Sequence, residues 1–128
     1  MDIIFERKTD KNFDKAVEDL KASLKEKTFG VLVELNLKDK LQERGQDFNT
    51  NFLVLEVCNP VKAKAVLDKK IEVGYMLPCK MAVYEKNGEV WMGMQNPKML
   101  IDLIGDDSLA DVAEEVYQHL SSAIEAAV

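Results

Sequence analysis

The sequence has few of the residues on which recognisable chemistry usually depends. Its 128 residues include one histidine, one tryptophan and two cysteines, and aromatic residues make up 7% of the chain. The six glycines do not cluster into a phosphate-binding loop, and there is no nucleophile elbow or His-Glu-x-x-His zinc motif. These absences argue against a nucleotide cofactor, and no motif identifies a reaction.

Long apolar runs are also missing. No run approaches the roughly 18 to 20 residues that a membrane-spanning helix needs, so we expect no membrane partner. The start, "MDIIFERK", has no basic leader followed by a long apolar segment, so we do not expect a signal peptide. The cytoplasm is therefore the expected location. Thiols stay reduced there, and a structural disulfide is not expected.

Basic residues are absent from the last part of the chain. The net charge is −6, from 17 basic and 23 acidic residues, and no Lys or Arg follows Lys98. Nucleic-acid binding depends on clustered Lys and Arg, so we expect no nucleic-acid partner. The acidic end is interpreted as a solvated surface that favours solubility.

The apolar residues that are present alternate between the spacing of helices and that of strands. The pattern predicts strands at 2–7, 29–37 and 51–58 and a hairpin at 79–95; it predicts helices at 13–27, 38–45, 60–69, 98–105 and 108–128. The length is that of one domain. We therefore expect a single α+β domain over residues 1–128, with a mostly antiparallel sheet and helices packed on one face.

The clearest local signal is a hairpin centred on Asn87-Gly88. These two residues separate two alternating runs, which is typical of a two-residue type I′ turn. The resulting register places Tyr84 opposite Trp91. It puts Met81, Val83, Val90, Met92 and Met94 on one face, with Cys79 in line, and Lys80, Ala82, Tyr84, Lys86, Trp91 and Gly93 on the other.

Aromatic residues outside a core often mark an interface. Ala82, Tyr84 and Trp91 are therefore predicted to form a contact surface with a second subunit. The alternative is that a helix of the same chain covers them. The methionines on the opposite face are interpreted as core residues, although thioethers are also able to bind copper.

The two cysteines are the main candidates for a site. Cys58 precedes the Asn59-Pro60 step, where a helix is expected to begin, and a helix N-terminus lowers a thiol pKa. Cys79 is followed by Lys80, whose ammonium also favours thiolate. If the two strands are neighbours, both sulfur atoms meet at one rim.

The rim of Cys58, Asn59, Cys79 and Lys80 is therefore the predicted ligand site. Cys58 and Cys79 are candidate ligands of zinc or copper, or a pair that cycles between dithiol and disulfide. The alternative is that both cysteines simply pack, because free cysteine is among the residues most often buried. Their spacing matches no metal or redox signature.

Other polar residues are weaker candidates. His119 has Glu115 four residues before it, a spacing able to hold a metal ion, but it is better interpreted as a half-packed residue at the edge of an apolar stripe. If the strands of Glu34 and Glu56 are adjacent, the two acids share a face, and paired carboxylates shift each other's pKa. Exposed edge polarity, or a salt bridge to Lys80 or Lys86, is the simpler interpretation of both.

The segments "LVLEVCNPVKAKAVL" and "VGYMLPCKMAVYEKNGEV", with the order of the elements, resemble the bacterial domain-of-unknown-function 302 family over nearly the whole chain. The resemblance implies a compact α+β domain of the TATA-binding-protein-like fold class, and a homodimer. It implies no activity, and a fold does not by itself imply function.

The sequence thus favours a cytosolic homodimer that binds a small ligand or a metal at the cysteine-containing rim. One alternative is a thiol-dependent redox enzyme or sensor with Cys79 as nucleophile and Lys80 stabilising its thiolate. The other is a non-catalytic interaction domain that uses Tyr84 and Trp91.

Overall fold

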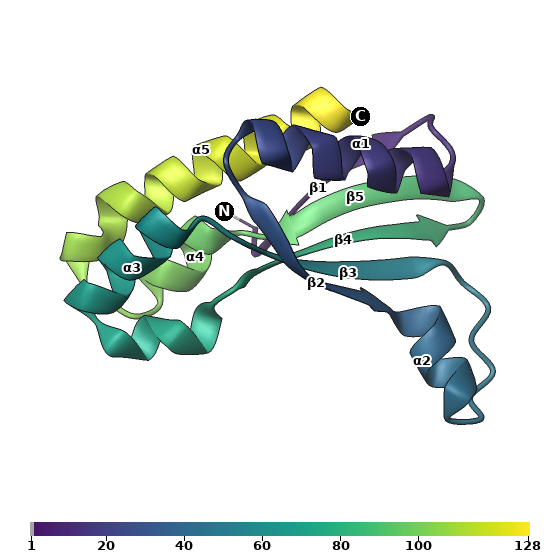
Figure 1. The fold of residues 1–128 in the computed structure, drawn as a ribbon, viewed down its shortest axis with the longest axis horizontal. Helices are drawn as coiled ribbons and strands as arrows, with labels where there is room; N and C mark the ends of the chain where they lie inside the picture. Colours follow the sequence, from purple (N-terminus) through teal and green to yellow (C-terminus); the bar gives the residue numbers. More distant parts are fainter. Residues whose placement is uncertain (1) are drawn as a thin grey trace.

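The fold is built on one five-stranded sheet (Figure 1). The structure is a computed structural model and describes residues 2–128. The sheet order is β1-β5-β4-β3-β2, and every neighbouring pair is antiparallel. The strands are β1 (Ile4–Thr9), β2 (Gly30–Asn36), β3 (Phe52–Cys58), β4 (Cys79–Lys86) and β5 (Glu89–Gln95).

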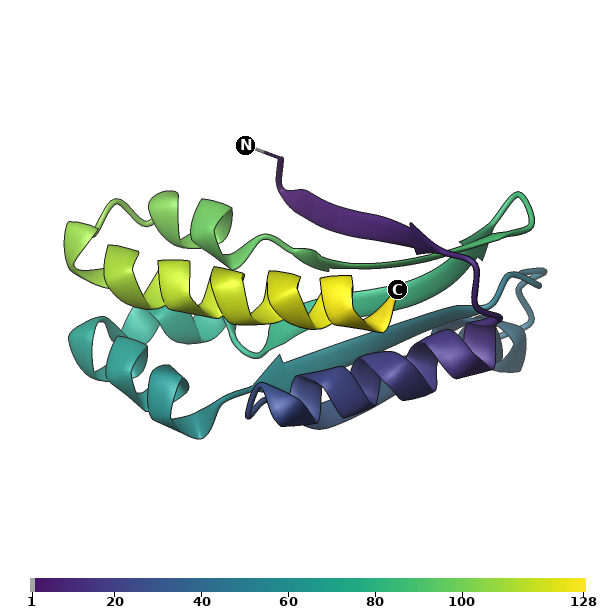
Figure 2. The same cartoon turned by 90° about the horizontal axis from the view of Figure 1, so that it is seen from above.

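The two long helices lie side by side on one face of the sheet (Figures 1 and 2). They are α1 (Phe13–Glu26) and α5 (Ala110–Ala127), and α2 (Leu37–Glu43) lies on the other side of the sheet in Figure 1. The remaining helical segments are α3 (Pro60–Lys69), the 3-10 helix η1 (Ile71–Met76), α4 (Pro97–Asp102) and the 3-10 helix η2 (Asp107–Leu109). The predicted α+β class, with an antiparallel sheet and helices packed against it, is confirmed.

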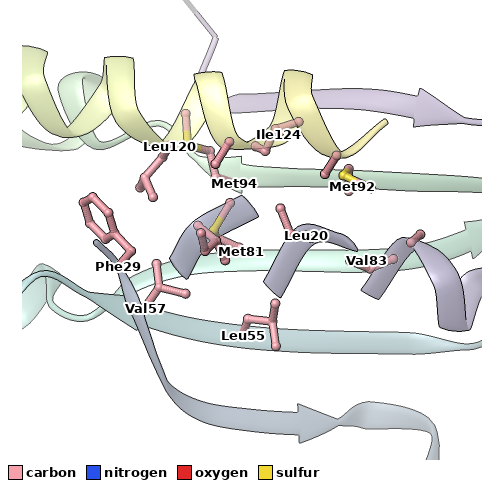
Figure 3. Packing of buried hydrophobic residues seen from close by; sticks show 14 of the residues in the cluster. Leu20, Phe29, Leu55, Val57, Met81, Val83, Met92, Met94, Leu120 and Ile124 are labelled. Carbon is pink, nitrogen blue, oxygen red and sulfur yellow. The ribbon is translucent and has the colours of Figure 1, made fainter. Parts of the chain in front are cut away.

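The core fills the space between this sheet face and α1 and α5 (Figure 3). Leu20 of α1 and Leu120 of α5 are fully buried against Leu55 of β3. The Ser23 hydroxyl donates to the Ala123 carbonyl at 2.7 Å, which ties α1 to α5. The hairpin methionines Met81, Met92 and Met94 are buried in the same cluster, as their alternation with valines predicts.

The β4–β5 hairpin has the predicted register. Asn87 and Gly88 form its turn with φ angles of 53° and 79°, the left-handed region that this turn type requires. Tyr84 pairs with Trp91 and Met81 with Met94. The two predicted faces of the hairpin are therefore confirmed.

The predicted alternation in β2 is wrong beyond its first residues. The pattern placed Val31, Val33 and Leu35 on one side of the strand. Val31 lies opposite Val57 on the helix-covered face, but a bulge follows, and Val33 and Leu35 lie opposite Glu56 and Val54 on the other face. One extra residue reverses the side to which every later side chain points, so Val33 is 44% exposed.

The starts of the helices are partly as predicted. Asn12 caps α1, and its Oδ1 accepts from the Lys15 amide. Ser108 and Asp111 have the spacing of a capping box, but that box does not form. The Ser108 hydroxyl donates to Asp106, the residue that caps η2, at 2.7 Å, and α5 begins at Ala110.

Candidate functional site

The two cysteines lie at the end of the sheet where β3 finishes and β4 begins. Cys79 is the cross-strand partner of Val57, the residue before Cys58. Both cysteines are free and half-buried, and both line one cavity of about 50 Å³. We call this the cysteine cavity; apolar residues of α3, η1 and α5, among them Val66, Val73 and Val116, line the rest of it.

Asn59 also lines the cysteine cavity, but both of its polar atoms already form hydrogen bonds with other parts of the chain. Its Oδ1 accepts from the Lys62 amide at 3.1 Å and caps α3. Its Nδ2 donates to the Thr28 carbonyl at 3.2 Å and to the Thr28 hydroxyl at 2.9 Å. These bonds tie the start of α3 to the segment between α1 and β2, and a ligand in the cavity would have to compete with them.

Lys80 does not belong to this site. The alternation of β4 turns its side chain to the opposite face from Cys79, directly across from Glu56. The cysteine cavity is therefore lined by Cys58, Asn59 and Cys79 and not by Lys80, although Lys80 and Cys79 both line a smaller cavity of about 30 Å³. Sequence adjacency suggested that the two side chains act together, but successive strand residues point to opposite faces.

The expectation of acidic thiols is wrong. Burial and, to a smaller extent, the neighbouring Cys58 raise the pKa of the Cys79 thiol to about 11. Burial also raises the pKa of Cys58. Desolvation in apolar surroundings outweighs the helix N-terminus, and a protonated thiol is a poor nucleophile.

The donor set does not complete a metal site. Within residues 2–128 there is no group of three or more His, Cys, Asp or Glu residues placed to hold one ion. Zinc in structural sites takes four ligands, and the cysteine cavity offers two. His119 packs edge-on against Phe29, with ring centroids 6.4 Å apart.

The two strand carboxylates also stay apart. Glu34 pairs with Lys21 of α1 on the helix-covered face, whereas Glu56 lies on the other face because of the bulge in β2. They therefore form no carboxylate pair.

A larger hollow lies on the face of the sheet opposite α1 and α5, which we call the open face. It is a groove of about 430 Å³. Its floor is the cross-strand pair Ala82 and Gly93, whose small side chains leave the space empty. We call it the sheet groove, and its main lining residues are Glu6, Phe52, Lys80, Ala82, Tyr84 and Gly93.

Gly93 is required by the close approach of β1. A Cβ atom at this position would lie 2.5 Å from the Phe5 carbonyl oxygen and 2.6 Å from the Glu6 Cβ. No real Cβ atom tolerates such contacts, so only glycine allows β1 to pair here. The same glycine keeps the groove floor open.

One wall of the sheet groove is aromatic and carries a fixed polar group. The Tyr84 ring stacks on Phe52, with centroids 5.2 Å apart and planes at 18°. The Tyr84 hydroxyl donates to Glu6 Oε2 at 2.7 Å. Burial and the Glu6 carboxylate raise the pKa of Tyr84 to about 12, so the phenol remains a hydrogen-bond donor at neutral pH.

The residues predicted as an interface all lie on the open face. Ala82 and Tyr84 line the sheet groove, and Trp91 lies beside Tyr84 in the neighbouring strand. Within the described residues, the Trp91 indole N–H is buried and has no hydrogen-bond partner. Glu6 and Phe52 were not predicted for any site, because only the pairing of β1 and β3 with the central strands brings them to the groove.

The fold and these two hollows define a small α+β protein with an antiparallel sheet covered on one face, in which no metal centre is assembled by residues 2–128. The chain belongs to the family "Domain of unknown function DUF302", whose model matches residues 5–127. This membership confirms the family resemblance.

One solved structure shows how closely the fold is shared. The chain is similar to an uncharacterized conserved DUF302 protein from Bacillus stearothermophilus, with 36% identity, a TM-score of 0.96 and 100% of both chains covered. The comparison with curated proteins found no match. No helix between residues 2 and 128 combines the length and apolar character needed to cross a bilayer.

Proposed function

We propose that this protein is a non-catalytic domain that binds a small ligand in the sheet groove. The observation that carries the proposal is the size of the sheet groove together with its mainly apolar and aromatic lining. Small-molecule sites commonly enclose about 300 to 1,000 Å³. The sheet groove has about 430 Å³ and the cysteine cavity about 50 Å³.

The chemistry of the groove supports the same proposal. A few polar groups stand on an otherwise apolar and aromatic surface: the Glu6 carboxylate, the Tyr84 hydroxyl and the Lys80 ammonium. Such a surface orients a ligand through its polar groups and retains it through apolar contact. The ligand site predicted at the cysteines is accordingly proposed to lie on the open face.

Filling the groove tests the proposal. We expect small molecules that raise the melting temperature of the wild type to bind Ala82→Phe at least tenfold more weakly, because the new ring occupies the groove floor. Binding is measured by calorimetry, and circular dichroism checks that the variant is folded. Cys58→Ala is the control, because it alters the cysteine cavity and leaves the groove unchanged.

The opposite result would indicate that the ligand binds in the cysteine cavity. Loss of binding in Cys58→Ala, with full binding in Ala82→Phe, contradicts the groove proposal. A screen in which no molecule stabilises the wild type also contradicts it.

A site at Cys58 and Cys79 is the second candidate, supported by the fact that both thiols line one cavity. It would hold a group of a few atoms, or a zinc or copper ion that takes further ligands from another molecule. Elemental analysis of the purified protein tests this. Stoichiometric metal that is lost in Cys58→Ser supports it, and metal-free protein after incubation with zinc or copper removes it. The raised pKa of Cys79 argues against the redox alternative.

We also propose that the protein is a homodimer joined through the open face near Trp91. The support is the row of neighbouring aromatic residues Phe52, Tyr84 and Trp91, which neither α1 nor α5 covers. Trp91 lies beside the groove and does not line it, so a second copy seated there borders the ligand site.

Exchanging Trp91 for Lys is expected to give monomers by light scattering, because an ammonium would be buried without a partner. The matched control is Tyr75→Lys, at a tyrosine of η1 that is 95% exposed. If Trp91→Lys remains a dimer, the interface does not lie at Trp91. A cytosolic location belongs to the same proposal and is supported by the two free thiols.

A further inference from the structure

We propose that the ligand of the sheet groove is an organic cation, an ammonium group carried on a compact apolar or aromatic body. The inference rests on the proposed function, because it names the chemistry of the ligand in the same groove. The charge and the surroundings of Glu6 carry it.

Glu6 is a half-buried carboxylate whose neighbouring cations pair with other residues. Arg7 points to the other face and pairs with Glu125 of α5 at 2.7 Å. Lys8 pairs with Glu89 of β5 at 2.8 Å. Within residues 2–128, Glu6 takes part in no ion pair, so its negative charge is left for a group from outside.

The Glu6 carboxylate is also held in place. The Tyr84 hydroxyl donates to Oε2 at 2.7 Å from the far side of the Gly93 gap. This bond orients the carboxylate along the groove, and within the described chain Oε1 accepts no hydrogen bond. A fixed carboxylate with a free oxygen is a good partner for an ammonium donor, since charge-assisted hydrogen bonds are about twice as strong as neutral ones.

The remainder of the groove suits the body of such a ligand. The stacked rings of Phe52 and Tyr84 form an apolar wall near Glu6, and Val54 adjoins them. Aromatic rings attract cations and also pack against flat apolar groups. A ligand with its ammonium at Glu6 and its body over Ala82 would use both features.

Among residues 2–128, Lys80 is the one cation that lines the groove, and it does not reverse this assignment. It is exposed to solvent and lies opposite Glu56 in the strand register, although no ion pair joins the two. Water solvates an exposed ammonium well. The charge in the groove that is half-buried and held in place is that of Glu6.

The test uses three phenethyl compounds that differ only in the group at the end of the chain: phenethylammonium, 2-phenylethanol and 3-phenylpropionate. Calorimetry on the full chain is expected to show that the ammonium compound binds at least tenfold more tightly than either of the others. In Glu6→Gln the ammonium compound is expected to lose about tenfold to a hundredfold in affinity and the alcohol to be unaffected. Gln keeps the shape of the side chain and an acceptor for the Tyr84 hydroxyl.

Glu89→Gln is the matched control. It removes a carboxylate from the far end of the open face and is expected to leave the affinity for phenethylammonium unchanged. The fluorescence of Trp91, the only tryptophan of the chain, gives a second readout close to the groove. If Glu6→Gln and Glu89→Gln lose the same affinity for phenethylammonium, the loss reflects the net charge of the protein and not a contact with Glu6. That result would overturn the assignment of Glu6.

The outcomes separate this inference from the proposed function. If the screen finds only neutral or anionic ligands that Ala82→Phe excludes, the cation assignment is overturned and the groove remains a ligand site. If Ala82→Phe excludes no ligand of any charge, both are overturned. If the ammonium compound binds only to a monomeric Trp91→Lys variant, a second copy of the chain fills the groove and the cation assignment is overturned.

Discussion

At the scale of single residues, burial decides the reactivity of the two thiols. Cys58 and Cys79 belong to one cavity, but they differ in how strongly their pKa is raised. At pH 8 a thiol with a pKa of about 11 is about 0.1% thiolate, and only the thiolate reacts readily. We therefore expect Cys79 to react slowly despite its position next to Lys80.

We accordingly expect Cys58 to be alkylated first. The variant Cys79→Ser, which retains Cys58, should react with iodoacetamide at pH 8 at least tenfold faster than Cys58→Ser, which retains Cys79. Mass spectrometry at timed intervals measures the two rates. Faster alkylation of Cys79 would show that it carries an activated thiolate, and the redox alternative would then be supported.

The hydrogen bond between Glu6 and Tyr84 also depends on the residues that the fold places around them. The two residues are 78 positions apart in the chain and belong to β1 and β4, which are not neighbours in the sheet. They meet across Gly93 of the intervening strand β5, because glycine has no side chain to separate them. The sequence predicts Tyr84 only as part of an interface and does not predict Glu6 for any site.

At the scale of elements, the β4–β5 hairpin is the part of the fold that local chemistry specifies most directly. Gly88 has a φ of 79°, a conformation that a residue with a Cβ atom adopts only at a cost. The turn fixes the register, and the register decides that Met81, Met92 and Met94 face the core. A change at Gly88 therefore acts on the whole hairpin.

Gly88→Ala is expected to lower the free energy of unfolding by about 1 kcal/mol, because alanine is strained at this φ. Urea unfolding followed by circular dichroism measures the change. Gly74→Ala is the control: its new Cβ would lie 3.5 Å from Leu67 Cδ2, an ordinary contact, and should change stability by less than about 0.5 kcal/mol. Equal effects in the two variants would show that the turn conformation is not the cause.

The β2 strand shows where a local pattern fails. Its alternating Val31, Val33 and Leu35 indicate one buried face, and a single bulge divides them between two faces. The following helix α2 buries none of its residues, so this part of the chain contributes little to the core. A bulge depends on the partner strand and on the sheet around it, which the spacing of apolar residues does not describe.

At the scale of the whole molecule, one side chain connects two clusters of buried residues. The larger cluster lies between the sheet and the helices α1 and α5, and the smaller one centres on Val66, Val73 and Leu109. Val112 of α5 packs against both. The α3–η1 end is therefore expected to unfold together with the sheet.

We expect one cooperative urea transition. The fluorescence of Trp91 reports on the sheet and far-UV circular dichroism reports mainly on the helices, so the two midpoints should coincide. An earlier transition by circular dichroism alone would show that the α3–η1 end opens independently. Repeating the measurement at two protein concentrations also tests the proposed dimer, whose midpoint should rise with concentration.

Much of the fold follows from local patterns, and much less of the candidate site does. The helices that contain Leu20 and Leu120, the helix start at Asn59 and the turn at Asn87-Gly88 were all predicted, because each depends on residues a few positions apart. The meeting of Cys58 and Cys79 depended on β3 and β4 being neighbours, which could be stated only as a condition. The prediction failed at Lys80, since adjacency along a strand places two side chains on opposite faces.

Periodicity and turn chemistry were thus enough for the class of fold, the principal helices and the two faces of the hairpin, since these are set by short-range interactions along the chain. The sheet groove depends on the order β1-β5-β4-β3-β2, which sets Glu6, Ala82 and Tyr84 beside one another from distant segments. The thiol pKa values likewise depend on which helices close over the end of the sheet. Long-range packing decides both, because burial and charge pairing are properties of neighbours in space and not of neighbours in sequence.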